Sequence, residues 1–473
     1  MKTILSCAWM LLVTALLPPC LADQPRNLLI IQTDEHHFNT LGCYGGTVVE
    51  TPNIDWIANQ GALCTSFYAT TPVCSPSRAS LVSGLYPQKT PVTQNNIPLA
   101  DEVVTFAELL RRNGYATGYA GKWHLDGDGK PQWAPKRKFG FEDNRFMFNR
   151  GHWKKFEDTP KGPRIAARNR KGPTYGVEGA DESSYATDWL CGKTIDFIRT
   201  HHQKPFCYMV SLPDPHGPNT VRSPYDEMYA NANVKIPSTL VRSAQQIPGW
   251  GKPSNVRPGQ LRNLMRKYYG MVKCIDDNIG KILDELRQHQ ILESTIVVFT
   301  SDHGDLCGEH GRLNKGVPYE GSARIPFLIY CDGKIVPKTR IEEALTCVDF
   351  LPTAMSLLGV DVPHEVDGRD ASGLFSGQAD SWEDISFCRS TSTRTPWISV
   401  LTKQYKLVFS TEDAPWLIDL TNDPAEVVNR FADSALAEQK RQMTEKLLAY
   451  ARRHNDPYVR NPKIREQIQR ILD

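Results

Sequence analysis

Four apolar stretches of this 473-residue chain each lead directly into charged or imidazole side chains. "NLLIIQT" is followed by Asp34 and Glu35, and "TIVVFTS" by Asp302 and His303. Carboxylate oxygens are the ligands that hard divalent cations prefer, so Asp34, Glu35 and Asp302 predict a metal site, and calcium fits such a set best. Asp305 is a weaker candidate, because its position also suits the capping of the following turn.

The other two stretches lead to cations and histidines. "GYATGYA" is followed closely by Lys122 and His124, and "PFCYMVSL" by His216. Arg78 and Lys315 add two further cations from turn-rich parts of the chain. A metal ion and several cations around one anion predict transfer of a phosphoryl or sulfuryl group, because they stabilise the charge that develops on the equatorial oxygens.

Cys74 lies in "TPVCSPSRASLVSG", a turn sequence rather than an apolar run. We expect Pro76 to be the first residue of a helix and Ser75 to be its cap, so that the thiol lies beside helix-terminal N–H groups that favour an anion. The other cysteines of the chain show no disulfide pattern, and most of them, such as Cys207 and Cys274, fit buried core positions. Cys74 is therefore the candidate for chemistry.

"CSPSRASLVSG" resembles the signature of the type I sulfatases of the alkaline-phosphatase-like superfamily, in which the cysteine of C-x-P-x-R is oxidised to formylglycine by a maturation enzyme. Five further motifs lie in the family's order and cover nearly the whole mature chain: "IIQTDE", "GKWHL", "PDPH", "TSDHGD" and "LIDLTNDPAEVVNRF". The resemblance implies that Cys74, as hydrated formylglycine, is the nucleophile. One hydroxyl of the diol attacks sulfur and the other later expels sulfate, an exit that a thiol does not have.

The resemblance also implies a role for each remaining candidate. Arg78 and Lys122 would hold and activate the hydrated formylglycine, and His124 would help to release sulfate. His216 would protonate the leaving alcohol, and Lys315 would hold the sulfate oxygens. The metal site implied by the family consists of Asp34, Glu35, Cys74, Asp302 and His303. The family usually has Asp where Glu35 stands and Asn where His303 stands, and an imidazole is a softer ligand than calcium prefers.

The elements that must position these residues alternate between strands and helices. Together with the resemblance, this predicts an α/β fold with a large mixed β-sheet flanked by helices. Helices are expected from a cap at Thr51, from a capping box between Thr105 and Glu108, and over residues 261–290, where apolar residues recur at intervals of three and four. Because ligands bind at the carboxyl ends of the strands in open α/β sheets, the four polar tails can converge on one site.

The ends of the chain differ in texture from its middle. Residues 1–22 contain Lys2, an apolar run and small residues before the expected cut, which indicates a secretory signal that is too short to span a membrane. Near the other end, "WISVLT", "YKLVFS" and "PWLIDL" predict an antiparallel meander, followed by a helix from about residue 434. We therefore expect a secreted or periplasmic protein with a catalytic domain over 23–380 and a C-terminal antiparallel-sheet-plus-helix subdomain over 381–473.

The substrate is less constrained by the sequence. A formal net charge of +2 gives no argument for nucleic acid or a membrane surface. Residues 133–175 carry 12 Lys and Arg against 4 Asp and Glu, interleaved with aromatic residues. They are either saccharide subsites or a solvated loop with a few core aromatics, and at least one of His36 and His37 is expected to face solvent. We predict a sulfated oligo- or polysaccharide substrate, with small aryl sulfates or phosphonate and phosphodiester substrates as alternatives.

Overall fold

The centre of the molecule is an eight-stranded mixed sheet with the strand order β13-β2-β12-β11-β1-β10-β4-β5. This computed structural model describes residues 27–379 and 381–473, so the expected secretory signal lies outside the described residues. The strands are β1 (Asn27–Asp34), β2 (Ala62–Cys64), β4 (Ala116–Lys122), β5 (Asp143–Phe148), β10 (Phe206–Pro215), β11 (Thr295–Ser301), β12 (Phe327–Tyr330) and β13 (Thr339–Ile341). The five strands from β11 to β5 are parallel, while β12 is antiparallel to both of its neighbours. The predicted mixed sheet is confirmed.

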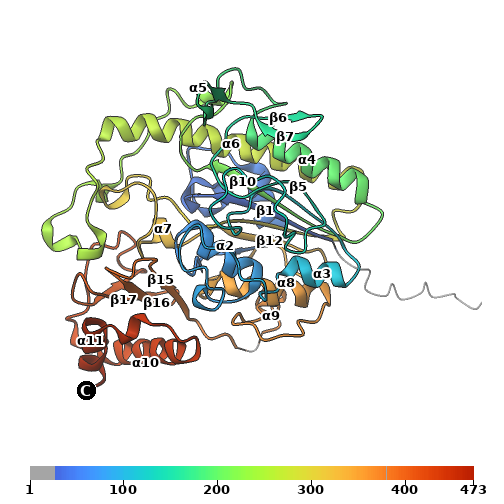
Figure 1. Cartoon of the computed structure of the whole chain (residues 1–473). Helices are drawn as coiled ribbons and strands as arrows, with labels where there is room; N and C mark the ends of the chain where they lie inside the picture. Colours follow the sequence, from blue (N-terminus) through green and yellow to red (C-terminus); the bar gives the residue numbers. More distant parts are fainter. Residues whose placement is uncertain (1–26, 380) are drawn as a thin grey trace, which may run out of the picture.

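Strand β1 lies in the middle of the sheet and supplies side chains to two separate cores. Leu29 and Ile31 pack with α1 (Pro52–Gln60), α4 (Ala186–His201) and α6 (Pro258–Gln288). Leu28 and Ile30 pack on the other face with α2 (Cys74–Ser83), α3 (Phe106–Arg112), α8 (Phe350–Leu358) and α9 (Ser372–Ser376). Figure 1 shows α4 and α6 above the sheet and α2, α3, α8 and α9 below it. A strand covered on both faces needs apolar residues without alternation, which explains the continuous apolar run "NLLII".

Of the helices that cover the sheet, α1, α3 and α6 begin and end close to the positions expected. α2 begins two residues earlier than expected, and α4, α8 and α9 were not predicted. The capping box between Thr105 and Glu108 is present at the start of α3. No helix in the described part of the chain is long and apolar enough to cross a membrane, and no disulfide joins the described cysteines.

The C-terminal region forms a second, four-stranded antiparallel sheet. Its strands are β15 (Ser386–Arg389), β16 (Trp397–Leu401), β17 (Tyr405–Ser410) and β18 (Trp416–Asp419). One face packs under α10 (Ala437–Arg453) and α11 (Pro462–Leu472), and the other packs against Val317 and Tyr319 of the large domain. The predicted meander and helix are confirmed, and β15 and α11 are additional (Figure 1).

Short elements decorate this framework. They are the helices α5 (Tyr225–Met228) and α7 (Glu320–Ala323) and the paired strands β3 (Phe67–Tyr68) with β14 (Leu345–Thr346), β6 (Phe156–Thr159) with β7 (Gly162–Ile165), and β8 (Arg168–Asn169) with β9 (Gly172–Pro173). The β6–β7 and β8–β9 pairs belong to the chain that follows β5, next to the edge of the sheet.

Candidate active site

The carboxyl ends of four adjacent parallel strands bring the expected residues to one edge of the sheet. β1 ends at Asp34, β4 ends at Lys122, β10 ends one residue before His216, and Asp302 follows β11. In the order β11-β1-β10-β4 these strands are direct neighbours, so residues up to about 270 positions apart in sequence meet.

α2 begins at Cys74, two residues before the expected first residue, Pro76. The N-cap is Val73, and the backbone N–H of Ser75 is satisfied by the side chain of Asn95 at 3.0 Å. The prediction that Ser75 caps a helix beginning at Pro76 is therefore wrong: Ser75 lies inside the first turn, and its hydroxyl donates to the backbone oxygen of His124 instead. The thiol therefore lies at the N-terminal turn of α2, where the helix dipole favours an anion.

The thiol of Cys74 is surrounded by cations although it is buried. Burial disfavours the thiolate, but Lys122 and Lys315 outweigh it and hold the pKa of Cys74 well below its ordinary value. The ammonium of Lys122 lies 3.6 Å from Sγ and 2.5 Å from a carboxylate oxygen of Asp34. The position therefore favours an anionic or strongly polarised side chain at residue 74.

Arg78, one helical turn after Cys74, fixes the two carboxylates beside it. Its guanidinium donates to Asp302 at 2.8 Å and to Asp34 at 3.3 Å. It also donates to the backbone oxygen of Lys122 at 2.7 Å and to the hydroxyl of Ser211 at 2.6 Å. Because every one of these groups is buried, Arg78 acts as a rigid clamp rather than as a free cation.

Four side chains form a cluster that fits a divalent cation. One ligand atom from each of Asp34, Cys74, Asp302 and His303 lies within 4.8 Å of the others. Nδ1 of His303 lies 2.9 Å from the backbone oxygen of Gly304, which leaves Nε2 facing Cys74 at 3.2 Å. Burial disfavours the imidazolium, yet Asp302 outweighs it and raises the pKa of His303 to about 9. Ligand atoms gathered this closely suit a cation that replaces the proton of His303.

Glu35 lies next to this cluster, with its carboxylate in contact with two other expected residues. It is 2.9 Å from Nε2 of His216 and 3.1 Å from the ammonium of Lys315. Burial opposes ionisation, but His216 and Lys315 lower the pKa of Glu35 to about 2. Its φ angle of 61° is the left-handed conformation, which a non-glycine residue adopts at some cost in strain. That Glu35 ligates a metal ion stays a prediction.

His124 contacts the side chain of Cys74. Its Nε2 lies 3.2 Å from the amide oxygen of Asn96, and its backbone oxygen accepts a hydrogen bond from Ser75 at 2.7 Å. Burial lowers the pKa of His124, so the neutral ring is favoured. His124 also has a φ angle of 61°, which makes it the second strained residue of the site.

His152 is a residue of the site that the sequence reasoning missed. Its ring lies parallel to that of His216, with the centroids 3.4 Å apart, and its Nε2 lies 2.8 Å from the ammonium of Lys122. It follows β5, which is parallel to β4 and which the sequence reasoning did not predict. A histidine that follows a strand is the same signal that identified His216, and it was present in "RFMFNRGH".

Asp305 and the pair His36 and His37 lie beside the site without belonging to its ligand cluster. Asp305 caps its turn by accepting from the backbone N–H groups of Cys307 and Asn314, as expected. The prediction that His36 or His37 faces solvent is wrong, because the two side chains are 0% and 2% exposed. The hydroxyl of Tyr268 on α6 bonds the backbone beside them and closes this region.

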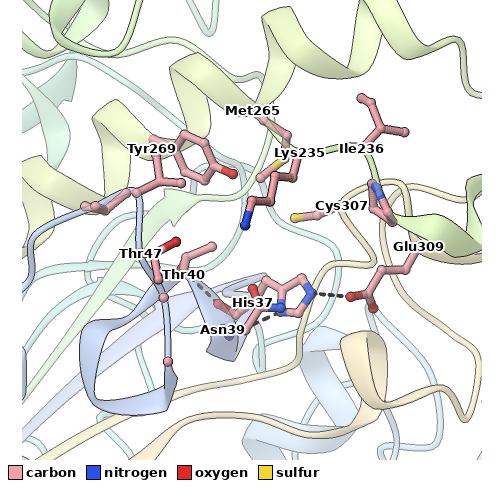
Figure 2. Close-up of a pocket in the computed structure, with 15 residues that line it drawn as sticks. His37, Asn39, Thr40, Thr47, Lys235, Ile236, Met265, Tyr269, Cys307 and Glu309 are labelled. Atoms are coloured by element: carbon pink, nitrogen blue, oxygen red, sulfur yellow. Dashed lines mark hydrogen bonds and ion pairs between the residues drawn. The ribbon is translucent and has the colours of Figure 1, made fainter. Parts of the chain in front are cut away.

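His37 pairs with Glu309 at 3.2 Å instead of facing solvent. Figure 2 shows the pair on one side of a pocket of about 290 Å³, with Met265 and Tyr269 of α6 on the other side. His37 thus has a structural partner.

Most aromatic residues of the segment 133–175 belong to the core. Phe139, Phe141, Phe148 and Phe156 are at most 2% exposed. The interpretation as a loop with core aromatics describes these four rings, because a buried ring cannot stack on a sugar. Tyr175 is half-buried, lies 6.3 Å from the ring of His152, and faces Lys130 at 5.0 Å.

The family model for sulfatases matches residues 26–360. The chain belongs to the sulfatase family. It is a sulfuric ester hydrolase of the alkaline-phosphatase-like superfamily. The model of the N-sulphoglucosamine sulphohydrolase C-terminal region also matches residues 308–453 of this sulfatase.

Individual sulfatases and a solved structure are similar to this chain over most of its length. The sulfatase is 28% identical to an arylsulfatase of Clostridium perfringens over 444 residues, which covers 85% of this chain and 89% of the relative. It is 24% identical to an N-acetylglucosamine-6-O-sulfatase of Bacteroides thetaiotaomicron over 530 residues, with 94% and 90% covered. The solved phosphonate monoester hydrolase of Agrobacterium radiobacter has the same fold, with a TM-score of 0.74, 24% identity and 91% and 96% of the two chains covered.

Proposed function

We propose that this sulfatase is exported and removes sulfate from a sulfated oligo- or polysaccharide, using formylglycine formed from Cys74 and one calcium ion. The observation that carries the proposal is the position of Cys74, at the start of α2 between Lys122 and the cluster of Asp34, Asp302 and His303. The carbohydrate assignment is supported by a relative named as an N-acetylglucosamine-6-O-sulfatase. Export rests on the sequence of residues 1–22, and location in the periplasm or outside the cell follows from it.

The residues present fit both groups that this chemistry needs. When present, formylglycine supplies a hydrated aldehyde as nucleophile, and calcium, held by Asp34, Asp302, His303 and residue 74, supplies Lewis acidity toward a sulfate oxygen. Two carboxylates provide the hard oxygen ligands, and Arg78 holds both of them in place. A maturation enzyme that oxidises Cys74 is therefore a required partner.

Side chains of the protein neutralise charge, hold the sulfate and supply the proton. Lys122 lies against residue 74 and against Asp34, so it neutralises negative charge at the nucleophile. Lys315 lies 3.1 Å from the carboxylate of Glu35, and its ammonium can hold sulfate oxygens. His216, whose Nε2 lies 2.9 Å from the same carboxylate, donates a proton to the leaving alcohol.

The arrangement also fixes the side from which the substrate enters. Lys122 and Asp34 are fully buried, whereas the side chains of His152, His216 and Lys315 are 22%, 15% and 17% exposed. Sulfate thus points inward toward residue 74, and the alcohol side of the ester remains at the exposed mouth. A sugar attached to a longer chain can be accommodated there.

Mass spectrometry of the peptide that contains residue 74 tests the nucleophile. In protein made with a maturation enzyme we expect formylglycine, and a full-occupancy thiol in active protein would refute the mechanism. Cys74→Ala should abolish hydrolysis of every sulfate ester. Cys191→Ala, which changes a buried cysteine of α4, is the matched control and should leave both the modification and the activity intact.

A panel of defined sulfated oligosaccharides, 4-nitrophenyl sulfate and a phenylphosphonate monoester tests the substrate class. We expect the largest kcat/KM on one of the saccharides. A preference for the aryl sulfate would favour small esters, as the name of the arylsulfatase relative suggests. A preference for the phosphonate would favour the activity named for the structural neighbour, which shares the fold.

A further inference from the structure

His152 and His216 form a stacked pair at the mouth of the site, although they come from different strands. The ring centroids are 3.4 Å apart and the planes differ by 7°. His152 follows β5 and His216 follows β10, and β4 with its terminal Lys122 lies between these two strands. The pair therefore bridges over Lys122, whose ammonium lies 2.8 Å from Nε2 of His152.

Both halves of the pair are held by the same buried lysine. Lys154, two residues after His152, donates to the carboxylate of Asp214 at 2.6 Å and to the backbone oxygen of His216 at 3.0 Å. Lys154 and Asp214 are both 0% exposed. On this side of His152 the chain cannot move without moving the turn that carries His216.

The residues that flank His152 are fixed as well. The indole of Trp153 is 5% exposed, packs at a tilt against Tyr175 with the ring centroids 4.6 Å apart, and donates to the backbone oxygen of Arg150 at 3.1 Å. Gly151 has a φ angle of 114°, and a Cβ atom there would lie 2.3 Å from the Trp153 ring nitrogen. His152 therefore belongs to a rigid loop.

We infer that His152 is a positioning residue, which holds the ring plane of His216 by stacking and holds the ammonium of Lys122 by accepting its hydrogen bond. This inference rests on the proposed function of the site. Nδ1 of His216 lies 2.8 Å from the backbone oxygen of Gly217, which limits rotation of the ring within its plane. The parallel face of His152 limits tilting, so it helps to fix the direction of Nε2, which also contacts Glu35 at 2.9 Å and Lys315 at 2.8 Å.

The two contacts of His152 affect different parts of the reaction. The stack acts through His216, so its loss should matter most when the leaving group needs a proton. The hydrogen bond acts through Lys122 at the nucleophile, so its loss should slow all esters alike. Since a displacement of about 1 Å in a reacting group can cost on the order of 100-fold in rate, even a modest tilt of His216 should be measurable.

The test uses full-length matured enzyme and three probes of decreasing leaving-group acidity: 4-nitrophenyl, phenyl and 4-methoxyphenyl sulfate. His152→Ala should lower kcat/KM by about 10-fold or more on the 4-methoxyphenyl ester beyond its effect on the 4-nitrophenyl ester. His152→Phe keeps the stacked face and should lower all three rates by a common factor. His152→Gln keeps an acceptor for Lys122 and should show the leaving-group dependence of His152→Ala.

His216→Ala provides the second arm, because His152→Ala should add no further leaving-group dependence in its background. The matched control is His202→Ala, which removes one ring of the half-buried His202–His289 stack, with centroids 4.1 Å apart, outside the active site. It should change no rate. Thermal unfolding of each variant shows that it is folded.

Equal slowing of the three esters by His152→Ala, or a wild-type pattern in His152→Gln, would overturn the stacking role. No loss in any His152 variant would overturn the inference entirely. Activity that persists in Cys74→Ala, or wild-type enzyme without action on any sulfate ester, would instead overturn the proposed function on which the inference rests.

Discussion

Replacing Lys154 by methionine should destabilise the large domain strongly, because it leaves a buried charge without its partner. The side chain of Met has a similar volume, so the main change is loss of the ammonium that contacts Asp214 at 2.6 Å. The carboxylate would retain two hydroxyl donors, Tyr185 at 2.6 Å and Thr187 at 2.5 Å. Breaking one side of a buried ion pair costs about 3–5 kcal/mol.

The corresponding shift in Tm follows from the size of the domain. Unfolding about 350 residues carries an entropy of roughly 0.7 kcal/mol/K, so Lys154→Met should lower Tm by about 4–7 °C in a calorimetric scan. Adding Asp214→Asn removes the uncompensated charge and should recover part of the loss. Lys193→Met, which breaks the more exposed pair with Asp158 at 2.7 Å, is the matched control and should shift Tm by about 1 °C or less.

A decrease in Tm below about 1 °C for Lys154→Met would refute the reasoning, since an uncompensated buried carboxylate should lower the free energy of unfolding by several kcal/mol. A double variant less stable than Lys154→Met would also refute it. In that case the stability would come from the hydrogen bonds of Asp214 rather than from neutralising its charge.

Three further predictions concern backbone, pH and metal. Gly121→Ala should destabilise the protein by at least about 3 kcal/mol, because a Cβ atom there would lie 1.9 Å from the backbone oxygen of Ser211. A Cβ atom at Gly192 on α4 meets open space, so Gly192→Ala should stabilise the protein by about 0.5–1 kcal/mol, and the Tm values of the two variants test the contrast. Burial lowers the pKa of His310 to about 3, so below about pH 6.5 the unfolded chain binds more protons than the folded chain, and stability decreases as the pH decreases, by up to about 1.4 kcal/mol per pH unit. His310→Asn should therefore flatten the dependence of Tm on pH between about 7.5 and 5, and an unchanged slope would contradict this. Exhaustive chelation should abolish sulfatase activity and calcium should restore it; metal analysis that finds zinc at full occupancy would contradict the calcium assignment.

The elements that depend on residues close together in the sequence were predicted correctly. The continuous apolar run of β1 and the capping box of Thr105 and Glu108 depend on residues close in sequence, and both are present. The C-terminal meander likewise follows from short apolar runs separated by turns. These patterns also placed Asp34, Lys122 and Asp302 at strand ends, and hence at one edge of the sheet.

The errors arose where distant residues decide the outcome. The start of α2 depends on Asn95, and the burial of His36 depends on Tyr268 of α6, more than 200 residues away. β5 lies at the edge of the sheet and mixes buried, half-buried and exposed residues without a regular period, so "DNRFMF" resembles a solvated loop. The pairing of β5 with β4 brings His152 beside Lys122, and the sequence pattern does not specify this pairing.

The central place of β1 has a consequence for the biosynthesis of this sulfatase. Its partner β11 ends at residue 301, so the sheet around β1 cannot close until the ribosome has passed that point. At roughly 5–20 residues per second, about 10–45 s separate the synthesis of Cys74 from that of Ser301. Cys74 is 2% exposed in the folded protein, where an enzyme cannot reach it. The late closure of the sheet thus keeps the cysteine accessible as an extended peptide for the interval in which the proposed oxidation has to occur.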